Sequence, residues 1–119
     1  MASSIPKSEQ PGLFDSPTED VRIEEVVLYA LGDFQARGLL LEGRTLALDR
    51  LLAAFRRSFD EFGVEPLSDD MLAKQLARAG AKVDEVPSYV AKHPYRVTVG
   101  TELGARSLRF YRVRNSEAG

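Results

Sequence analysis

Cysteine and tryptophan are absent from this chain of 119 residues, and histidine occurs once. Without cysteine there is no disulfide framework, no thiolate nucleophile and no zinc-finger ligand set. A single histidine, His93, cannot build a histidine-based metal centre. These absences exclude whole classes of catalytic and metal-binding protein, and they suit a reducing compartment.

The chain also lacks a long apolar segment. No run approaches the ~18 apolar residues that span a bilayer. The N-terminus shows no basic flank followed by an apolar stretch, as a secretion signal would. We therefore expect a cytoplasmic protein that is neither exported nor embedded in a membrane. Because there is no glycine-rich phosphate loop and no nucleophile with a partnering base, we expect neither an enzyme nor a bound cofactor.

The composition that remains is that of one folded domain. Hydrophobic residues make up 44% and charged residues 29% of the chain, which disfavours collagen-like, coiled-coil and fully disordered proteins. A chain of this length suits one domain rather than two. Arginine outnumbers lysine by twelve to four, a bias that we attribute to a GC-rich coding sequence of a bacterium, plasmid or phage.

The pattern of apolar residues divides the chain into a tail, a domain and a short end. Residues 1–20 contain three of the six prolines and no periodic apolar pattern, so they bury too little surface to offset their ordering entropy. We expect this tail to be disordered. Residues 21–114 carry the periodicity of a folded domain, and residues 115–119 are expected to form a second disordered end.

Apolar residues recur at α-helical spacing in three segments of the first two thirds of the chain. Thr45 and Ser68 stand before two of these segments, and their side-chain oxygens suit them to cap a helix N-terminus. Glycine follows all three, as expected where a helix ends with a positive φ. The expected helices span residues 19–37, 45–62 and 69–79 and end at Gly38, Gly63 and Gly80.

After the third helix the apolar period changes to two. Residues 95–99 and 108–111 alternate polar and apolar side chains and are rich in aromatic and β-branched residues. With turn-forming residues between them, they predict an antiparallel hairpin over residues 95–113. A short apolar run at residues 39–41 predicts a brief strand between the first two helices. Residues 82–94 carry no assignable pattern.

The order helix, short strand, helix, turn, helix, two-stranded hairpin resembles a winged helix-turn-helix domain over roughly residues 21–114. The resemblance implies an α+β fold of three helices, a short strand and a C-terminal two-stranded antiparallel wing, with residues 68–80 as the recognition helix. The stretch from Phe59 to Gly80 and the basic hairpin are similar to the small C-terminal DNA-binding domains of phage and plasmid primase-helicases and replication proteins. We therefore expect a protein that binds double-stranded DNA in replication or transcription control.

The placement of charge favours the same function. Residues 1–70 carry seven bases and fourteen acids, whereas the rest of the chain carries nine bases and four acids. A nucleic-acid footprint is a local basic surface, so the net charge of −2 does not exclude one. Any one of these side chains also fits a solvated helix face or the protection of an edge strand. The expected DNA contacts are Lys74, Gln75, Arg78, Arg96, Arg106, Arg109, Arg112 and Arg114.

The tail contains a short segment, Gln10-Pro11-Gly12-Leu13-Phe14, that resembles the peptide by which bacterial replication and repair proteins bind the sliding clamp. Leu13 and Phe14 would enter an apolar pocket of the clamp, and Gln10 would form a hydrogen bond at its rim. Pro11 and Gly12 depart from the usual leucine and serine or aspartate. Alternatively, Leu13 and Phe14 pack against the domain itself.

The alternative function is a protein-interaction module, or a phage-encoded inhibitor, that uses the same fold to dock on a protein. The surface distinguishes the two functions. Arginines that converge on one face favour DNA, and a dominant exposed apolar patch favours a protein partner.

Overall fold

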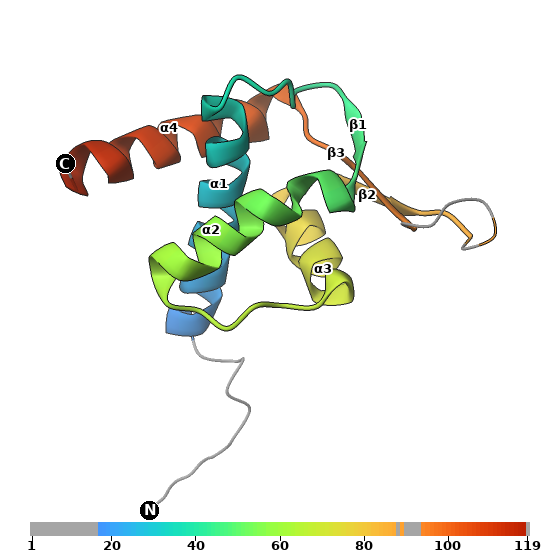
Figure 1. Ribbon diagram of the computed structural model, residues 1–119, viewed down its shortest axis with the longest axis horizontal. Helices are drawn as coiled ribbons and strands as arrows, with labels where there is room; N and C mark the ends of the chain where they lie inside the picture. Colours follow the sequence, from blue (N-terminus) through green and yellow to red (C-terminus); the bar gives the residue numbers. More distant parts are fainter. Residues whose placement is uncertain (1–16, 88, 90–93, 119) are drawn as a thin grey trace, which may run out of the picture.

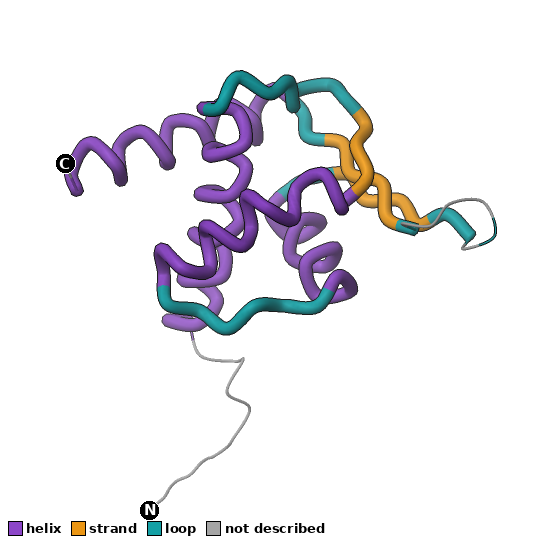
Figure 2. The backbone as a smooth tube through the Cα atoms, viewed as in Figure 1, coloured by secondary structure: helices purple, strands orange, loops and turns teal. Residues whose placement is uncertain are grey.

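The computed structural model describes residues 17–87, 89 and 94–118, and within them the fold is α+β (Figure 1). Four α-helices and one three-stranded antiparallel sheet make up this part of the chain (Figure 2). Their bounds are α1 (Pro17–Ala36), β1 (Thr45–Ala47), the 3-10 turn η2 (Leu48–Leu51), α2 (Leu52–Phe62), α3 (Asp69–Ala79), β2 (Lys82–Glu85), β3 (Tyr95–Thr98) and α4 (Thr101–Ala118).

The sheet has the order β1-β3-β2, so β3 lies in the middle and pairs with both of its neighbours. Leu46 of β1 and Val83 of β2 both lie opposite Val97 of β3. The hairpin formed by β2 and β3 projects from the body of the molecule (Figure 1). Since β3 also pairs with β1, the base of this hairpin is fixed to the rest of the domain.

The core lies where α1, α2, α3 and the sheet meet. Its apolar side chains come from all of these elements, and the N-terminal part of α4 adds one more. Burial of this apolar surface is the main force that holds the elements together. The fully buried members include Val26, Val27 and Leu31 of α1, Phe55 of α2, Leu72 and Leu76 of α3, and Val97 of β3.

The expected third helix is confirmed at both ends. The backbone N–H of Met71 donates to Ser68 Oγ at 3.3 Å, which is the capping bond that Ser68 was expected to make. Gly80 ends the helix with φ of 114°, in the left-handed region that glycine adopts without strain. The first helix is also confirmed, with small differences at its ends.

The expected C-terminal hairpin is wrong in its second strand. Residues 101–118 form α4, and the partner of β3 is β2, in the segment 82–94 that showed no pattern. Leu103 and Ser107 of α4 are buried one turn apart, so the period that matters here is helical. The alternation around residues 108–111 reflects half-buried residues on the flank of a helix, and packing against α1 overrides their β-propensity.

The expected strand at residues 39–41 is also wrong, because the first strand lies at Thr45–Ala47. Leu41 is buried, but Leu39 and Leu40 are exposed. Thr45 is therefore not a helix cap. Its hydroxyl lies 2.8 Å from the hydroxyl of Thr98 across the sheet, and the second helical segment begins with η2.

The expected boundaries of the domain also shift at both ends. Pro17 already belongs to α1, and residues 115–118 belong to α4 rather than to a disordered end. The clamp-like segment, with Gln10, Leu13 and Phe14, lies outside the described residues. None of the helices in the described part of the chain is both long and apolar enough to cross a membrane.

Candidate nucleic-acid interface

Helix α3 is held in place by one buried face. Leu72, Ala73 and Leu76 are buried against the core, and the capping bond from Ser68 fixes the first turn. The outward surface of α3 is exposed to solvent and carries Lys74 and Arg78 one turn apart, with Ala77 beside Lys74 on the side toward the hairpin and Arg78 bordering the pocket toward α1. The small side chain of Ala77 lets the helix backbone approach another surface closely on the hairpin side.

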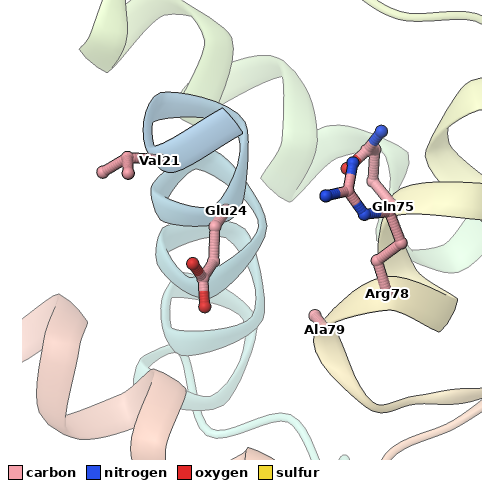
Figure 3. A pocket seen from close by; sticks show the side chains of 5 residues that line it. All are labelled: Val21, Glu24, Gln75, Arg78 and Ala79. Atoms are coloured by element: carbon pink, nitrogen blue, oxygen red, sulfur yellow. The ribbon is translucent and has the colours of Figure 1, made fainter. Parts of the chain in front are cut away.

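Gln75 lies on a different side of α3 from Lys74. It is half-buried and lines a small pocket between α3 and α1 (Figure 3). Figure 3 shows the polar ends of Gln75 and Arg78 close together, while Glu24 of α1 lies across the pocket from them. Gln75 is therefore less accessible to a base edge than the sequence pattern predicts.

A second, larger groove of about 550 Å³ separates α3 from the hairpin. Both α3 and the hairpin contribute apolar side chains to the groove, and its charged side chains are two acids and one lysine. The lining residues are Asp70, Ala73, Lys74 and Ala77 of α3, Val83 and Glu85 of β2, and Tyr95 of β3.

The electrostatic field in this groove is negative near the N-terminus of α3. The Tyr95 hydroxyl donates a hydrogen bond to Asp70 Oδ1. The pKa of Tyr95 is raised to about 12, mainly by this bond and also by desolvation and the charges of Asp70, Glu85 and Asp69. A phosphate would be repelled at this end of α3, so the cationic part of the helix is its middle and C-terminal half.

The predicted contact arginines do not converge on one face. Arg106, Arg109, Arg112 and Arg114 were expected in a wing but belong to α4. The C-terminal part of this helix and the hairpin extend toward opposite ends of the molecule (Figure 1). Arg96 alone of the predicted hairpin arginines lies in the hairpin, where it is half-buried opposite Asp84 and Ala47.

Two of the α4 arginines are engaged within the domain. Arg106 forms an ion pair with Glu24 of α1 at 3.5 Å. The Nε atom of Arg114 donates to Glu61 at 3.0 Å, and its guanidinium lies 4.0 Å from the ring centroid of Phe62. Arg109 and Arg112 point away from α1 and are exposed.

A buried polar cluster, which the sequence analysis missed, joins α1 to α2. Asp33 is only 2% exposed and accepts hydrogen bonds from Arg57 Nε at 2.8 Å and Arg37 Nε at 3.2 Å. Burial acts to raise the pKa of Asp33, but the two arginines outweigh it and hold the pKa below its ordinary value. The sequence indication was that Asp33 follows the apolar run of residues 26–31 in α1 and precedes Phe34.

The same region of α1 holds α4. Gln35 Nε2 donates to the carbonyl of Gly104 at 2.9 Å, and the Tyr29 hydroxyl donates to Asn115 Oδ1 at 3.2 Å. Burial is the main cause that raises the pKa of Tyr111, and the nearby Asp33 carboxylate adds to it. Helix α4 is therefore anchored to α1 by specific polar contacts as well as by apolar packing.

The described residues contain no group of three or more metal-ligating side chains placed to hold a metal ion. Comparison with protein-family models finds no match for this chain, and comparisons with curated proteins and with solved structures find none either.

Proposed function

We propose that this domain binds double-stranded DNA, with α3 in the major groove and the β2–β3 hairpin beside it. The observation that carries the proposal is the order of elements. Three helices with a short strand between the first two are followed directly by a projecting antiparallel hairpin. This is the order that led us to compare the chain with winged helix-turn-helix domains, with the hairpin now formed by β2 and β3.

The contact residues in this proposal are Lys74 and Arg78 of α3, with Arg96 at the hairpin. Lys74 and Arg78 are exposed, and the small side chain of Ala77 beside Lys74 leaves room for the backbone to approach the base edges. Arginine suits bidentate contact with guanine or phosphate, and lysine suits phosphate. Because Asp69 and Asp70 occupy the first turn, we assign the contact to the middle and end of α3.

A fluorescence anisotropy titration with a short labelled duplex at two salt concentrations tests the proposal. Replacing Lys74 and Arg78 together with alanine should weaken binding on all sequences. It should also lower the slope of log affinity against log salt by about 1.8, since each phosphate contact contributes about 0.9. The matched control replaces Arg50 and Arg56, two exposed arginines of η2 and α2, and should leave binding almost unchanged. Unaltered affinity in a folded Lys74→Ala, Arg78→Ala variant would contradict the proposal.

The second candidate function is docking on a protein, and the groove between α3 and the hairpin favours it. Its lining includes two acids, Asp70 and Glu85, which would attract a basic segment of a partner, and apolar side chains that a short peptide could contact. The variant Asp70→Asn, Glu85→Gln separates the two functions. Removing these charges should strengthen DNA binding because it removes repulsion, whereas it should weaken binding to a partner that carries a basic segment.

A further inference from the structure

Helix α4 carries two arginines that have no ion-pair partner among the described residues. Arg109 and Arg112 are both exposed, whereas their neighbours Arg106 and Arg114 are tied to Glu24 and Glu61. The pair therefore takes no part in holding α4 to the domain.

The other exposed side chains around these two arginines are short, and together with the arginines we call them the outer face of α4. Ala105, Val113 and Ser116 lie on the same exposed side of the helix. Among the described side chains of α4 the one acid is Glu102, seven residues before Arg109 and so about 10 Å away along the helix axis. Among the described side chains of α4, then, no carboxylate lies within one helical turn of the pair.

The outer face is also rigidly placed. Helix α4 crosses α1 closely at Gly32, and Gln35 and Tyr29 fix it on either side of the crossing. On a helix, Cβ atoms three residues apart lie about 5–6 Å from each other. The two arginine side chains therefore lie next to each other on the helix. Because the helix backbone is already ordered, binding costs little backbone conformational entropy.

Charge and composition point to a phosphate backbone as the occupant. Pairing of this face with a second copy of the chain about a two-fold axis would bring like charges together, and Val113, 51% exposed, would be the main apolar contribution. A membrane surface would require more apolar residues beside the arginines. Guanidinium groups bind phosphate by charge and by paired hydrogen bonds.

We propose that the outer face of α4 contacts phosphates of a second DNA segment, so that one molecule bridges two duplexes. The C-terminal part of α4 and the hairpin extend to opposite ends of the molecule (Figure 1). We therefore expect a short duplex on α3 and the hairpin to leave the outer face of α4 free, which the experiment below tests. The inference rests on the proposed binding of DNA by α3.

The experiment has two arms. The first measures binding of a single duplex of about 12 base pairs, roughly 40 Å long, by anisotropy. The second immobilises one duplex and measures how much of a second, dye-labelled duplex the protein captures. The variants are Arg109→Ala, Arg112→Ala for the outer face, Lys74→Ala, Arg78→Ala for α3, and Arg50→Ala, Arg56→Ala as the control with the same change of net charge.

We expect the Arg109→Ala, Arg112→Ala variant to bind the short duplex within about twofold of the native protein and to lose capture of the second duplex by tenfold or more, which corresponds to about 1.4 kcal/mol. The control should retain both properties. If the native protein binds the short duplex but captures no second one, the bridging inference is wrong and the proposed function stands. If the outer-face variant loses short-duplex binding as the α3 variant does, α4 belongs to one continuous contact and bridging is also wrong. If the native protein binds no duplex at all, the proposed function itself fails.

Discussion

At the scale of single residues, Gly32 shows how one position controls the docking of a whole helix. It lies in α1 where α4 crosses, and a Cβ atom there would collide with the backbone carbonyl of Ser107 and with Cβ of Tyr111. Two helices approach this closely where one of them has no side chain. A glycine within a helix ordinarily costs roughly 0.5–1 kcal/mol relative to alanine, so its presence here reflects packing rather than helix propensity.

We therefore expect Gly32→Ala to destabilise the protein, although the same change in an exposed helix would stabilise it. Overpacking at a close crossing typically costs about 1–3 kcal/mol, which exceeds the gain in helix propensity. Urea unfolding measures this free energy. Gly100→Ala is the control, because no heavy atom lies within 4 Å of an added Cβ there. A stabilised Gly32→Ala variant would show that α4 does not pack against α1 in solution.

A second prediction at this scale concerns Asp33 and the pH dependence of the free energy of unfolding. The pKa of Asp33 is lower in the folded protein than its ordinary value of 3.8. Its charged form therefore contributes stability above about pH 4, and this contribution is lost as the pH falls through the lowered pKa. Asp33→Asn should lower the free energy of unfolding at pH 7 by about 2 kcal/mol, because Arg57 and Arg37 lose their charged acceptor.

The measurement is urea unfolding of both proteins between pH 7 and pH 3. The difference between them should shrink as the pH falls, because protonation removes the same charge that the substitution removes. If the difference in the free energy of unfolding stays constant over this range, the two arginines do not stabilise the charged form of Asp33.

At the scale of secondary-structure elements, Tyr95 of β3 links the hairpin to α3 by a hydrogen bond. Its hydroxyl donates to Asp70, and this bond is the main cause of the raised pKa of about 12. We expect Tyr95 to ionise well above the ordinary tyrosine value of 10.0. Asp70→Asn should bring the pKa of Tyr95 down toward that of an ordinary tyrosine. The ultraviolet absorbance of tyrosinate during a pH titration measures both, and Tyr95→Phe assigns the transition.

Sequence patterns predicted elements best where the elements are locally encoded. The bounds of α3 follow from Ser68 and Gly80, which make their own capping contacts within the helix. β2 was missed because four residues with a single half-buried apolar side chain, Val83, carry no alternation. α4 was mistaken for a strand because Phe110 and Tyr111 have high β-propensity, and the helical period appears only when its buried face against α1 is known.

At the scale of the whole molecule, the tail offers a test of a replication partner. We expect Gln10, Leu13 and Phe14 to bind a sliding clamp, which would add avidity to the DNA contacts of the domain. Replacing Leu13 and Phe14 with alanine should abolish clamp binding in a calorimetric titration and leave thermal stability unchanged. Loss of stability would instead mean that Leu13 and Phe14 pack against the domain. If the native protein shows no clamp binding at tens of micromolar, the clamp prediction is wrong.

The distribution of charge over the surface of the molecule could not be predicted from the positions of the charged residues along the sequence. The excess of bases in the C-terminal part of the sequence predicted one basic surface. Among the described residues these bases divide between α3 with the hairpin and α4, and two of those on α4 pair with acids from α1 and α2. For this reason the DNA proposal depends on Lys74 and Arg78, and the α4 arginines need a separate role.

The sequence by itself determined the properties that depend on near neighbours along the chain. These are an α+β fold, the ends of α3, and the exposure of Lys74 and Arg78 on an amphipathic helix. Tertiary structure decided which segment pairs with β3, that residues 101–118 are helical, and that Asp33 is buried with its two arginines. Helix caps and helical periodicity involve residues a few positions apart. Strand pairing, helix docking and the burial of a charge depend on partners tens of residues away, whose positions exist only in the folded chain.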